Sequence, residues 1–257
     1  MLNKIFDTHA HYDDEAFDED RETLIASLKE NGIVNVVNVG ASIESCKRTI
    51  EIVKKYDFFY GALGVHPSDT APLTEEDIKW LRNELISDKM VAVGEIGLDY
   101  HWDEPERDIQ KKWFIRQLEL AAEINKPVII HSRDAASDTL DIMKAERHYD
   151  VGGVIHCFSY SKEMAREYLN MGFYIGIGGV VTFNNAKKVK EVAEYVPLES
   201  IVLETDCPYL APVPNRGKRN SSINLTYVVD EISRIKGIEP DRLIEETYNN
   251  ALKLYRL

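Results

Sequence analysis

The chain of 257 residues has enough apolar side chain for a sizeable core, because 44% of its residues are hydrophobic. Its formal net charge of −13 argues against a protein that coats nucleic acid by bulk electrostatics, although bound divalent cations would reverse the field locally. No apolar run approaches the ~20 residues that cross a bilayer, no signal peptide is visible, and three scattered cysteines favour a reducing compartment. We therefore expect a cytoplasmic protein without membrane association.

Short β-branched runs alternate with longer helical patterns, with no linker, low-complexity block or internal repeat between them. The runs that favour strands number eight, about one per 32 residues, which is close to the spacing of a repeated β/α unit. Several runs are continuously apolar, as strands buried on both faces of a parallel barrel are. The expected strands cover residues 4–9, 35–40, 59–65, 91–97, 127–131, 152–156, 173–178 and 201–206.

Helix signals fill the intervals between these strands. Thr74 begins a variant of the capping box ahead of an apolar stripe. Ser161 is expected to cap a helix that ends before Gly172. The longest helix is expected over residues 106–125, with Trp113 as a core residue rather than part of a ligand site.

Five of the eight expected strands end in, or run into, a side chain that can bind metal. Alternation of strands and helices would also suit an open, doubly wound sheet, but barrel enzymes place their chemistry at the carboxyl ends of the strands. Charged and imidazole groups in apolar runs are costly unless something satisfies them, and metal ions do so for a whole cluster. We therefore expect one domain over residues 1–257, a single TIM (β/α)8 barrel with slight distortion allowed. Its active site would lie at the C-terminal face of the strands. The candidate metal ligands are His9, His11, Glu95, His131, His156 and Asp206.

The ligand types and their number indicate the kind of metal site. His9 and His11 are two residues apart, so they point to the same face of a strand and can share one cation. That pair alone is compatible with ligation or with ordinary burial, whereas the whole set is hard to explain as packing. Imidazoles mixed with carboxylates suit zinc, manganese, cobalt or iron and tolerate magnesium. Two divalent metal ions bridged by a carboxylate explain the set most simply, because one catalytic ion leaves positions open. We expect Mg, Mn or Zn.

With these residues, the sequence resembles the TatD family of deoxyribonucleases, a branch of the amidohydrolase-like metallohydrolases built on TIM barrels. The resemblance covers essentially the whole chain, and its motifs are specific when taken together. They are Asp-Thr-His-Ala-His at 7–11, Gly-Val-His-Pro at 64–67, Gly-Glu-Ile-Gly-Leu-Asp at 94–99, His-Ser-Arg at 131–133, His-Cys-Phe-Ser at 156–159, Glu-Thr-Asp-Cys-Pro at 204–208, Arg-Gly-Lys-Arg-Asn at 216–220 and Asn250.

The resemblance also implies how the ligands divide between two ions. The first metal would be held by His9, His11, Glu95 and Asp206. The second metal would be held by Glu95, His131 and His156, with Glu95 as the bridge. One departure is visible, because Ser221 and Ser222 follow Asn220 where family members often have Glu-Pro. This departure leaves the shape of that loop open, but not the metal site.

The expected function is hydrolysis of phosphodiester bonds by a TatD-like deoxyribonuclease that acts on single-stranded DNA ends. Two bound cations would lower the pKa of a water molecule that attacks phosphorus and would offset charge on the phosphoryl oxygens. Asp206 would orient that water and accept its proton. Asp206 and the bridging Glu95 are therefore the expected catalytic residues.

Basic and aromatic residues near the expected mouth are candidates for binding this substrate. Arg133 could reach a phosphate oxygen or could pair with a carboxylate. His66 could contact the scissile phosphate or make an ordinary hydrogen bond. Tyr100, His101 and Trp102 could stack a base or pack on the barrel rim. The dense basic run expected to border the mouth and bind phosphate comprises Arg216, Lys218 and Arg219.

Two other functions compete with this interpretation. The same scaffold could hydrolyse amide, lactone or aminoacyl ester bonds, because a fold does not select a chemistry. The basic residues argue against an uncharged amide substrate, which would not need them. A non-catalytic metal or nucleic-acid binding protein is the second alternative, and the intact ligand set argues against it. No obligate protein partner is evident.

Overall fold

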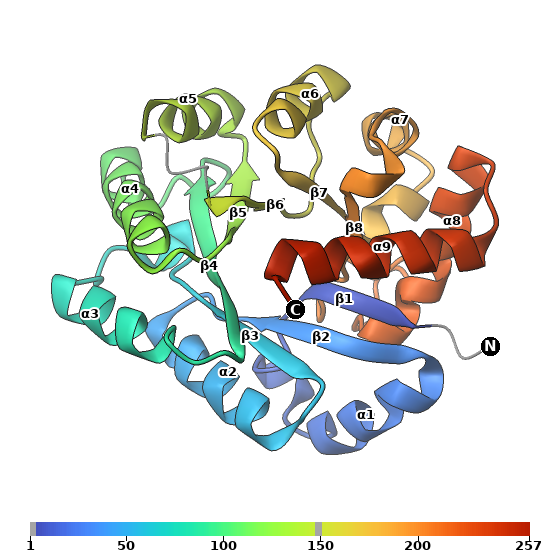
Figure 1. Ribbon diagram of the computed structural model, residues 1–257, viewed down its shortest axis with the longest axis horizontal. Coiled ribbons are helices and arrows are strands. Elements are labelled where there is room, and N and C mark those ends of the chain that lie inside the picture. Colours follow the sequence, from blue (N-terminus) through green and yellow to red (C-terminus); the bar gives the residue numbers. More distant parts are fainter. Residues whose placement is uncertain (1–3, 147–150) are drawn as a thin grey trace.

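The structure is a computed structural model that describes residues 4–146 and 151–257. Parallel strands follow one another in chain order around a barrel, and helices surround it (Figure 1). This arrangement confirms the expected TIM barrel, and each expected strand overlaps an observed one. The strands are β1 (Ile5–Ala10), β2 (Ile33–Val39), β3 (Phe59–Leu63), β4 (Met90–Asp99), β5 (Val128–Arg133), β6 (Gly153–Ile155), β7 (Tyr174–Ile177) and β8 (Ile201–Leu203).

The two helices with capping signals in the sequence begin where those signals place them. The Thr74 side chain accepts a hydrogen bond from the Asp77 backbone, and the Asp77 carboxylate accepts one from the Thr74 backbone, so the capping box is confirmed. Ser161 caps its helix as expected. The helices are α1 (Arg21–Leu28), α2 (Ile43–Lys55), α3 (Glu75–Glu84), α4 (Arg107–Ile124), α5 (Ala136–Glu146), α6 (Lys162–Asn170), α7 (Lys187–Tyr195), α8 (Leu225–Lys236) and α9 (Pro240–Tyr255).

The seam between β8 and β1 is the least regular part of the barrel. Consecutive strands share ladders, whereas β8 and β1 are joined through one bridge between Ala10 and Cys207. At that point the His11 backbone N–H donates to the Cys207 carbonyl over 2.8 Å, and the Asp206 N–H donates to the His9 carbonyl over 2.9 Å. The barrel is thus closed at the carboxyl ends of these strands, where three of the candidate ligands lie.

The amino-terminal end of the barrel is closed by α9, which crosses it in Figure 1. Ala251, Leu254 and Tyr255 of this helix pack into the apolar cluster inside the barrel, which includes Phe6 and Val202. The Tyr255 hydroxyl donates to the Thr8 carbonyl over 2.9 Å. One end of the barrel is therefore a packed core, and polar chemistry is confined to the other end.

No helix in the described ranges is long and apolar enough to cross a membrane. The longest described helix is α4, which has 18 residues and matches the helix expected over 106–125. Its Trp113 is buried, as expected for a core residue.

Truncation of α9 inside the barrel should destabilise the fold. Leu254 is 4% exposed and Leu257 is 44% exposed, so the two leucines are matched in type and differ in burial. We expect Leu254→Ala to lower the free energy of unfolding by about 2–5 kcal/mol and Leu257→Ala to change it by less than about 0.5 kcal/mol. Urea unfolding followed by circular dichroism measures both. Equal effects would mean that α9 does not close the barrel.

Candidate metal centre

The candidate ligands gather at the carboxyl end of the barrel because strand order brings their strands around one mouth. Three of them lie within β1, β4 and β5, and the other three lie in the segments that follow β1, β6 and β8. All have little or partial exposure. The structure brings together every member of the expected set, which is His9, His11, Glu95, His131, His156 and Asp206.

Glu95 lies at the centre of this cluster and faces it with both carboxylate oxygens. Its Oε1 lies 2.7 Å from His131 Nδ1 and 2.8 Å from His156 Nε2. Its Oε2 lies 3.5 Å from His9 Nε2 and 3.8 Å from His11 Nε2. Each oxygen therefore faces its own pair of imidazoles, which is the arrangement that a carboxylate between two cations requires.

Asp206 completes the side of the cluster formed by β1 and β8. Its Oδ1 lies 3.3 Å from His11 Nε2 and 3.6 Å from His9 Nε2, and these two nitrogens lie 3.1 Å apart. The ligand atoms of His9, His11 and Asp206 all lie within 4.8 Å of one another, close enough to hold one ion. His9, Glu95 and His156 form a second such group, so His9 borders both.

Two of the imidazoles are oriented by hydrogen bonds on their far nitrogens. His11 Nδ1 donates to the Val39 carbonyl over 2.7 Å. His131 Nε2 donates to Asp99 Oδ2 over 3.1 Å. Each contact leaves the other ring nitrogen as a lone-pair donor aimed into the cluster, as in metal-binding histidines with a fixed tautomer.

A glycine lets β4 and β5 approach closely enough for this contact. Gly97 has φ +149°, a conformation that L side chains rarely adopt, and a Cβ there would collide with the His131 carbonyl. Gly97 pairs with His131 in the ladder, two residues after Glu95 on β4. The close approach places Glu95 and Asp99 on either side of the His131 ring.

The buried carboxylates of the cluster favour positive charge beside them. Burial alone would raise the pKa of Glu95, but His156 and other imidazoles outweigh burial and hold the pKa well below its usual range. Burial and repulsion from His156 lower the pKa of His9 to about 4, which leaves this imidazole in the neutral form that binds metal. Burial would lower the pKa of His11, but Asp206 outweighs burial and raises it to about 9. Without metal the His11 imidazole therefore holds a proton, which a divalent cation would displace. The buried carboxylates and imidazoles together form a donor set that fits divalent cations.

A pocket of about 790 Å³ opens above this cluster. Arg133 lines it at the carboxyl end of β5, and His66 lines it after β3. Both were expected near the substrate, and both lie beside the metal cluster. In the part of the chain that the structure describes, no carboxylate pairs with Arg133, so its guanidinium is available to the pocket.

The basic loop after β8 does not line this pocket, contrary to expectation. Arg219 points away and pairs with Asp20 over 2.6 Å. The Arg216 guanidinium lies 4.3 Å from the centre of the Phe183 ring, and Lys218 is exposed. The physical reason is that an acidic partner and an aromatic face compete for these side chains away from the mouth.

The neighbouring loop contains serines where the resemblance would have Glu-Pro, and hydrogen bonds of Ser222 shape it. Ser222 Oγ donates to Asp7 Oδ2 over 2.6 Å, and the Ser222 N–H donates to the Tyr12 hydroxyl over 3.1 Å. Asn220 Nδ2 donates to the Thr205 carbonyl over 3.0 Å. These bonds attach the loop to β1 and to the segment before Asp206.

Several residues at the site were not expected from the sequence, and three of them bear on its chemistry. Asp99 orients His131, and Arg48 and Tyr209 line the pocket. Asp99 could have been found, because it lies four residues after Glu95 on one strand and therefore shares its face. Arg48 lies on α2, and the pattern of strands and strand ends does not predict which side of a helix faces the pocket.

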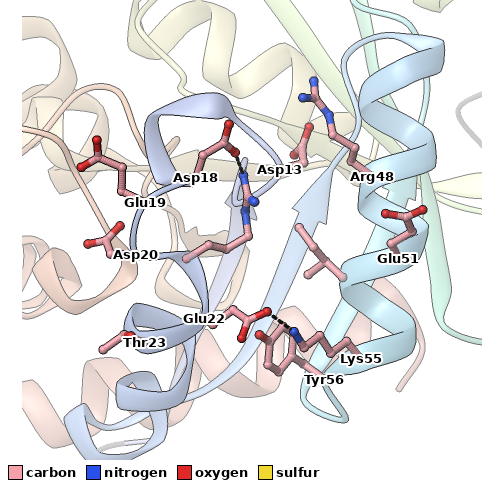
Figure 2. Close-up of a pocket in the computed structure, with 12 residues that line it drawn as sticks. Asp13, Asp18, Glu19, Asp20, Glu22, Thr23, Arg48, Glu51, Lys55 and Tyr56 are labelled. Carbon is pink, nitrogen blue, oxygen red and sulfur yellow. Dashed lines mark hydrogen bonds and ion pairs between the residues drawn. The ribbon is translucent and has the colours of Figure 1, made fainter.

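A second pocket of about 520 Å³ shares Asp13 and Arg48 with the first and continues along α2 (Figure 2). Figure 2 shows Arg48 and Glu51 on α2 facing the acidic segment that precedes α1. Two of the cations that line the pocket are already paired, Arg21 with Asp18 and Lys55 with Glu22. This neighbouring pocket is therefore acidic and unfavourable for phosphate.

Comparisons with known proteins agree with the geometry. A family model described as TatD related DNase matches residues 6–256. The metal-dependent hydrolase YabD of Bacillus subtilis, described as uncharacterized, is 45% identical over 98% of this chain and 99% of its own length. YcfH of Escherichia coli, described in the same way, is 35% identical over 98% of this chain and 96% of its own. The solved structure of YjjV, a TatD homologue from E. coli, is 29% identical, covers 100% of both chains and has a TM-score of 0.94.

The contact between Asp99 and His131 should influence metal affinity. Asp99→Asn keeps the size of the side chain but removes the charge that orients the imidazole, and we expect a loss of affinity of about 10–100-fold. Competition with a chelating dye for Mn²⁺ measures the change. Asp134→Asn is the matched control, because Asp134 contacts His101 rather than the cluster. Equal affinities of Asp99→Asn and wild type would show that Asp99 does not position His131.

Proposed function

The chain belongs to the TatD family of metal-dependent hydrolases, and from that premise we propose that it is a deoxyribonuclease acting on single-stranded DNA ends. We propose that two divalent cations, Mg, Mn or Zn, support the reaction. The observation that carries the proposal is Glu95, whose two oxygens face two different pairs of imidazoles. A shared carboxylate of this kind is typical of hydrolases with two metal ions.

The ligand assignment follows from these contacts and from the family motifs. We assign the first ion to His9, His11, Glu95 and Asp206, whose ligand atoms converge on the side of β1 and β8. We assign the second ion to Glu95, His131 and His156, which converge on Glu95 Oε1. His131 also belongs to a third group with His66 and Asp99. We assign no ion there, because Asp99 already orients His131. In addition, Nδ1 of His66 accepts a hydrogen bond from Ser68, so Nε2, which faces the cluster, carries a hydrogen and has no lone pair for a cation.

Bound divalent cations supply an activated water and offset the charge that develops on phosphoryl oxygens. Asp206 is placed to orient that water and to accept its proton. Its side chain is 17% exposed and lines the pocket, whereas the Glu95 side chain is 5% exposed. Burial would raise the pKa of Asp206, but His11 and the other imidazoles lower it, so the carboxylate is ionised and able to take a proton.

His66 is placed to donate a hydrogen bond to the scissile phosphate. Its Nδ1 accepts a hydrogen bond from the Ser68 backbone over 3.2 Å, so the hydrogen of the neutral ring is on Nε2. Burial and repulsion from His131 lower the pKa of His66 to about 3, which keeps the ring neutral. Nε2 lies 4.0 Å from Glu95 Oε1 and faces the metal cluster.

Arg133 is the cation that we assign to the substrate phosphate, since its guanidinium borders the same pocket without a carboxylate partner in the described ranges. Arg48 provides a second cation on the opposite flank of the pocket, beyond β2. Arg216 and Lys218 remain candidates for contact with a longer chain outside the pocket. Arginines at the mouth favour a phosphoester over an uncharged amide or lactone.

Cleavage should depend on metal and on two carboxylates. With metal-stripped protein, we expect Mg²⁺, Mn²⁺ or Zn²⁺ to restore cleavage of single-stranded DNA labelled at either end. Asp206→Ala and Glu95→Gln should each lower kcat by at least about 10²-fold, because they remove the proton acceptor and the bridge. Asp241→Ala is the control, since Asp241 lies in the first turn of α9 at the other end of the barrel.

Three results would contradict this function. Wild-type protein could fail to cleave DNA with every ion, or Asp206→Ala could retain full activity. Faster hydrolysis of a lactone or aminoacyl ester than of DNA would assign the site to acyl chemistry instead.

Arg133 should contribute to the salt dependence of substrate binding. Loss of one phosphate contact should weaken binding and reduce the slope of log K against log [salt] for single-stranded DNA by about 0.7. Fluorescence anisotropy with Asp206→Ala as the background measures binding without cleavage. Arg133→Ala is compared with Arg234→Ala, whose side chain pairs with Glu231 on the outer helix α8. An unchanged slope in Arg133→Ala would remove Arg133 from the phosphate site.

A further inference from the structure

Two aromatic side chains stand exposed at the rim of the pocket above the metal centre. Trp102 is 66% exposed and Tyr209 is 54% exposed, the highest values among the exposed aromatic residues in the described ranges. Both line the pocket, whereas Tyr195 and Tyr227, which are also exposed, do not. Exposed apolar surface gathered at one polar pocket is typical of a ligand-binding site.

The two rings are carried by segments on opposite sides of the barrel. Trp102 follows β4, and Tyr209 follows β8. In the strand order of the barrel, three strands separate β4 from β8 in either direction, and Figure 1 shows the two strands across the barrel from one another. Glu95 on β4 and Asp206 after β8 both approach His9 and His11, so the metal centre lies between the segments that carry the rings.

The backbone of each aromatic residue is hydrogen-bonded to an aspartate of the metal cluster or beside it. Asp99 Oδ1 accepts a hydrogen bond from the Trp102 backbone over 3.3 Å, and its Oδ2 contacts His131 over 3.1 Å. On the other side, the Tyr209 N–H donates to the Asp206 carbonyl over 2.9 Å. The backbone positions of Trp102 and Tyr209 are therefore held by the same residues that build the centre.

The groups around the rings identify the kind of molecule that fits between them. His66 and Arg133 offer hydrogen-bond donors to the same pocket, which suits a phosphate. The acidic pocket along α2 repels a phosphate chain in that direction (Figure 2). A ligand with one phosphate between two flat rings would match these groups, and two neighbouring nucleotides of a single strand have this form.

We propose that Trp102 and Tyr209 are stacking platforms for the two nucleobases that flank the scissile phosphate, one base on each side of the metal centre. The inference rests on the proposed function and adds the contacts that give a preference for unpaired bases. Every base has a flat face that can stack, so these platforms bind without selecting a sequence. Paired bases in a duplex are already stacked on their neighbours and do not reach two separate platforms.

The test combines protein variants with the removal of single bases. The substrate is a short single strand with one cleavable phosphodiester, prepared with both flanking bases, with either base replaced by an abasic analogue, or with both replaced. Trp102→Ala and Tyr209→Ala remove the platforms, while Trp102→Phe and Tyr209→Phe retain a ring. Tyr227→Ala is the control, because Tyr227 is exposed on α8 outside the pocket. The readout is kcat/KM for each pair of variant and substrate.

We expect Trp102→Ala and Tyr209→Ala each to lower kcat/KM on the substrate with both bases by roughly five- to 150-fold, the usual effect of losing one base stack. The Phe variants should recover most of this loss. Each Ala variant should lose its effect when one particular flanking base is absent, and the two variants should respond to different bases.

A loss that persists equally on the doubly abasic substrate would overturn the proposal, because it would show a purely structural role for the ring. Unchanged kcat/KM in both Ala variants would overturn it as well. Failure of the wild-type protein to cleave any of these substrates would instead overturn the proposed function, and the stacking platforms with it.

Discussion

The carboxylate of Glu95 is buried in the barrel mouth, with imidazole nitrogens against both of its oxygens. Burial of an ionised carboxylate is costly unless it is paired, so the surrounding residues must supply positive charge. The close approach of β4 and β5 at Gly97 brings His131 to one oxygen, and the closure of β8 on β1 brings Asp206 beside His9. The close approach of the strands and the choice of residues at the site thus both serve to pair the buried carboxylate of Glu95.

Polarity is unevenly distributed along the barrel axis. The amino-terminal end is filled by an apolar cluster that α9 covers, which leaves no space for polar groups there. At the carboxyl end the strands deliver side chains whose far nitrogens are held by backbone or by Asp99, as for His11 and His131. Apolar packing therefore supports the cluster from the amino-terminal end, and the pocket opens at the carboxyl end.

Much of this arrangement could be predicted from the sequence, and physical reasons separate the successes from the failures. The strands and the ligands at their ends were predicted because an apolar run ending in His or Asp is informative by itself, as at His131 and Asp206. The basic loop was expected to line the pocket, but a loop sequence does not show where its side chains point. Arg219 pairs with Asp20, which is distant in sequence. Tyr209 was missed because its role depends on which strand lies across the barrel, and only the closed fold shows that.

The central claim is that Glu95 lies between two divalent cations. Anomalous diffraction from crystals of the protein grown with Mn²⁺ would measure this most directly, by recording data on both sides of the manganese absorption edge. The account predicts two anomalous peaks, one near each oxygen of Glu95, separated by about 3.5–4 Å as in other hydrolases with two metal ions. A single peak at full occupancy, or two peaks that do not share Glu95, would contradict it.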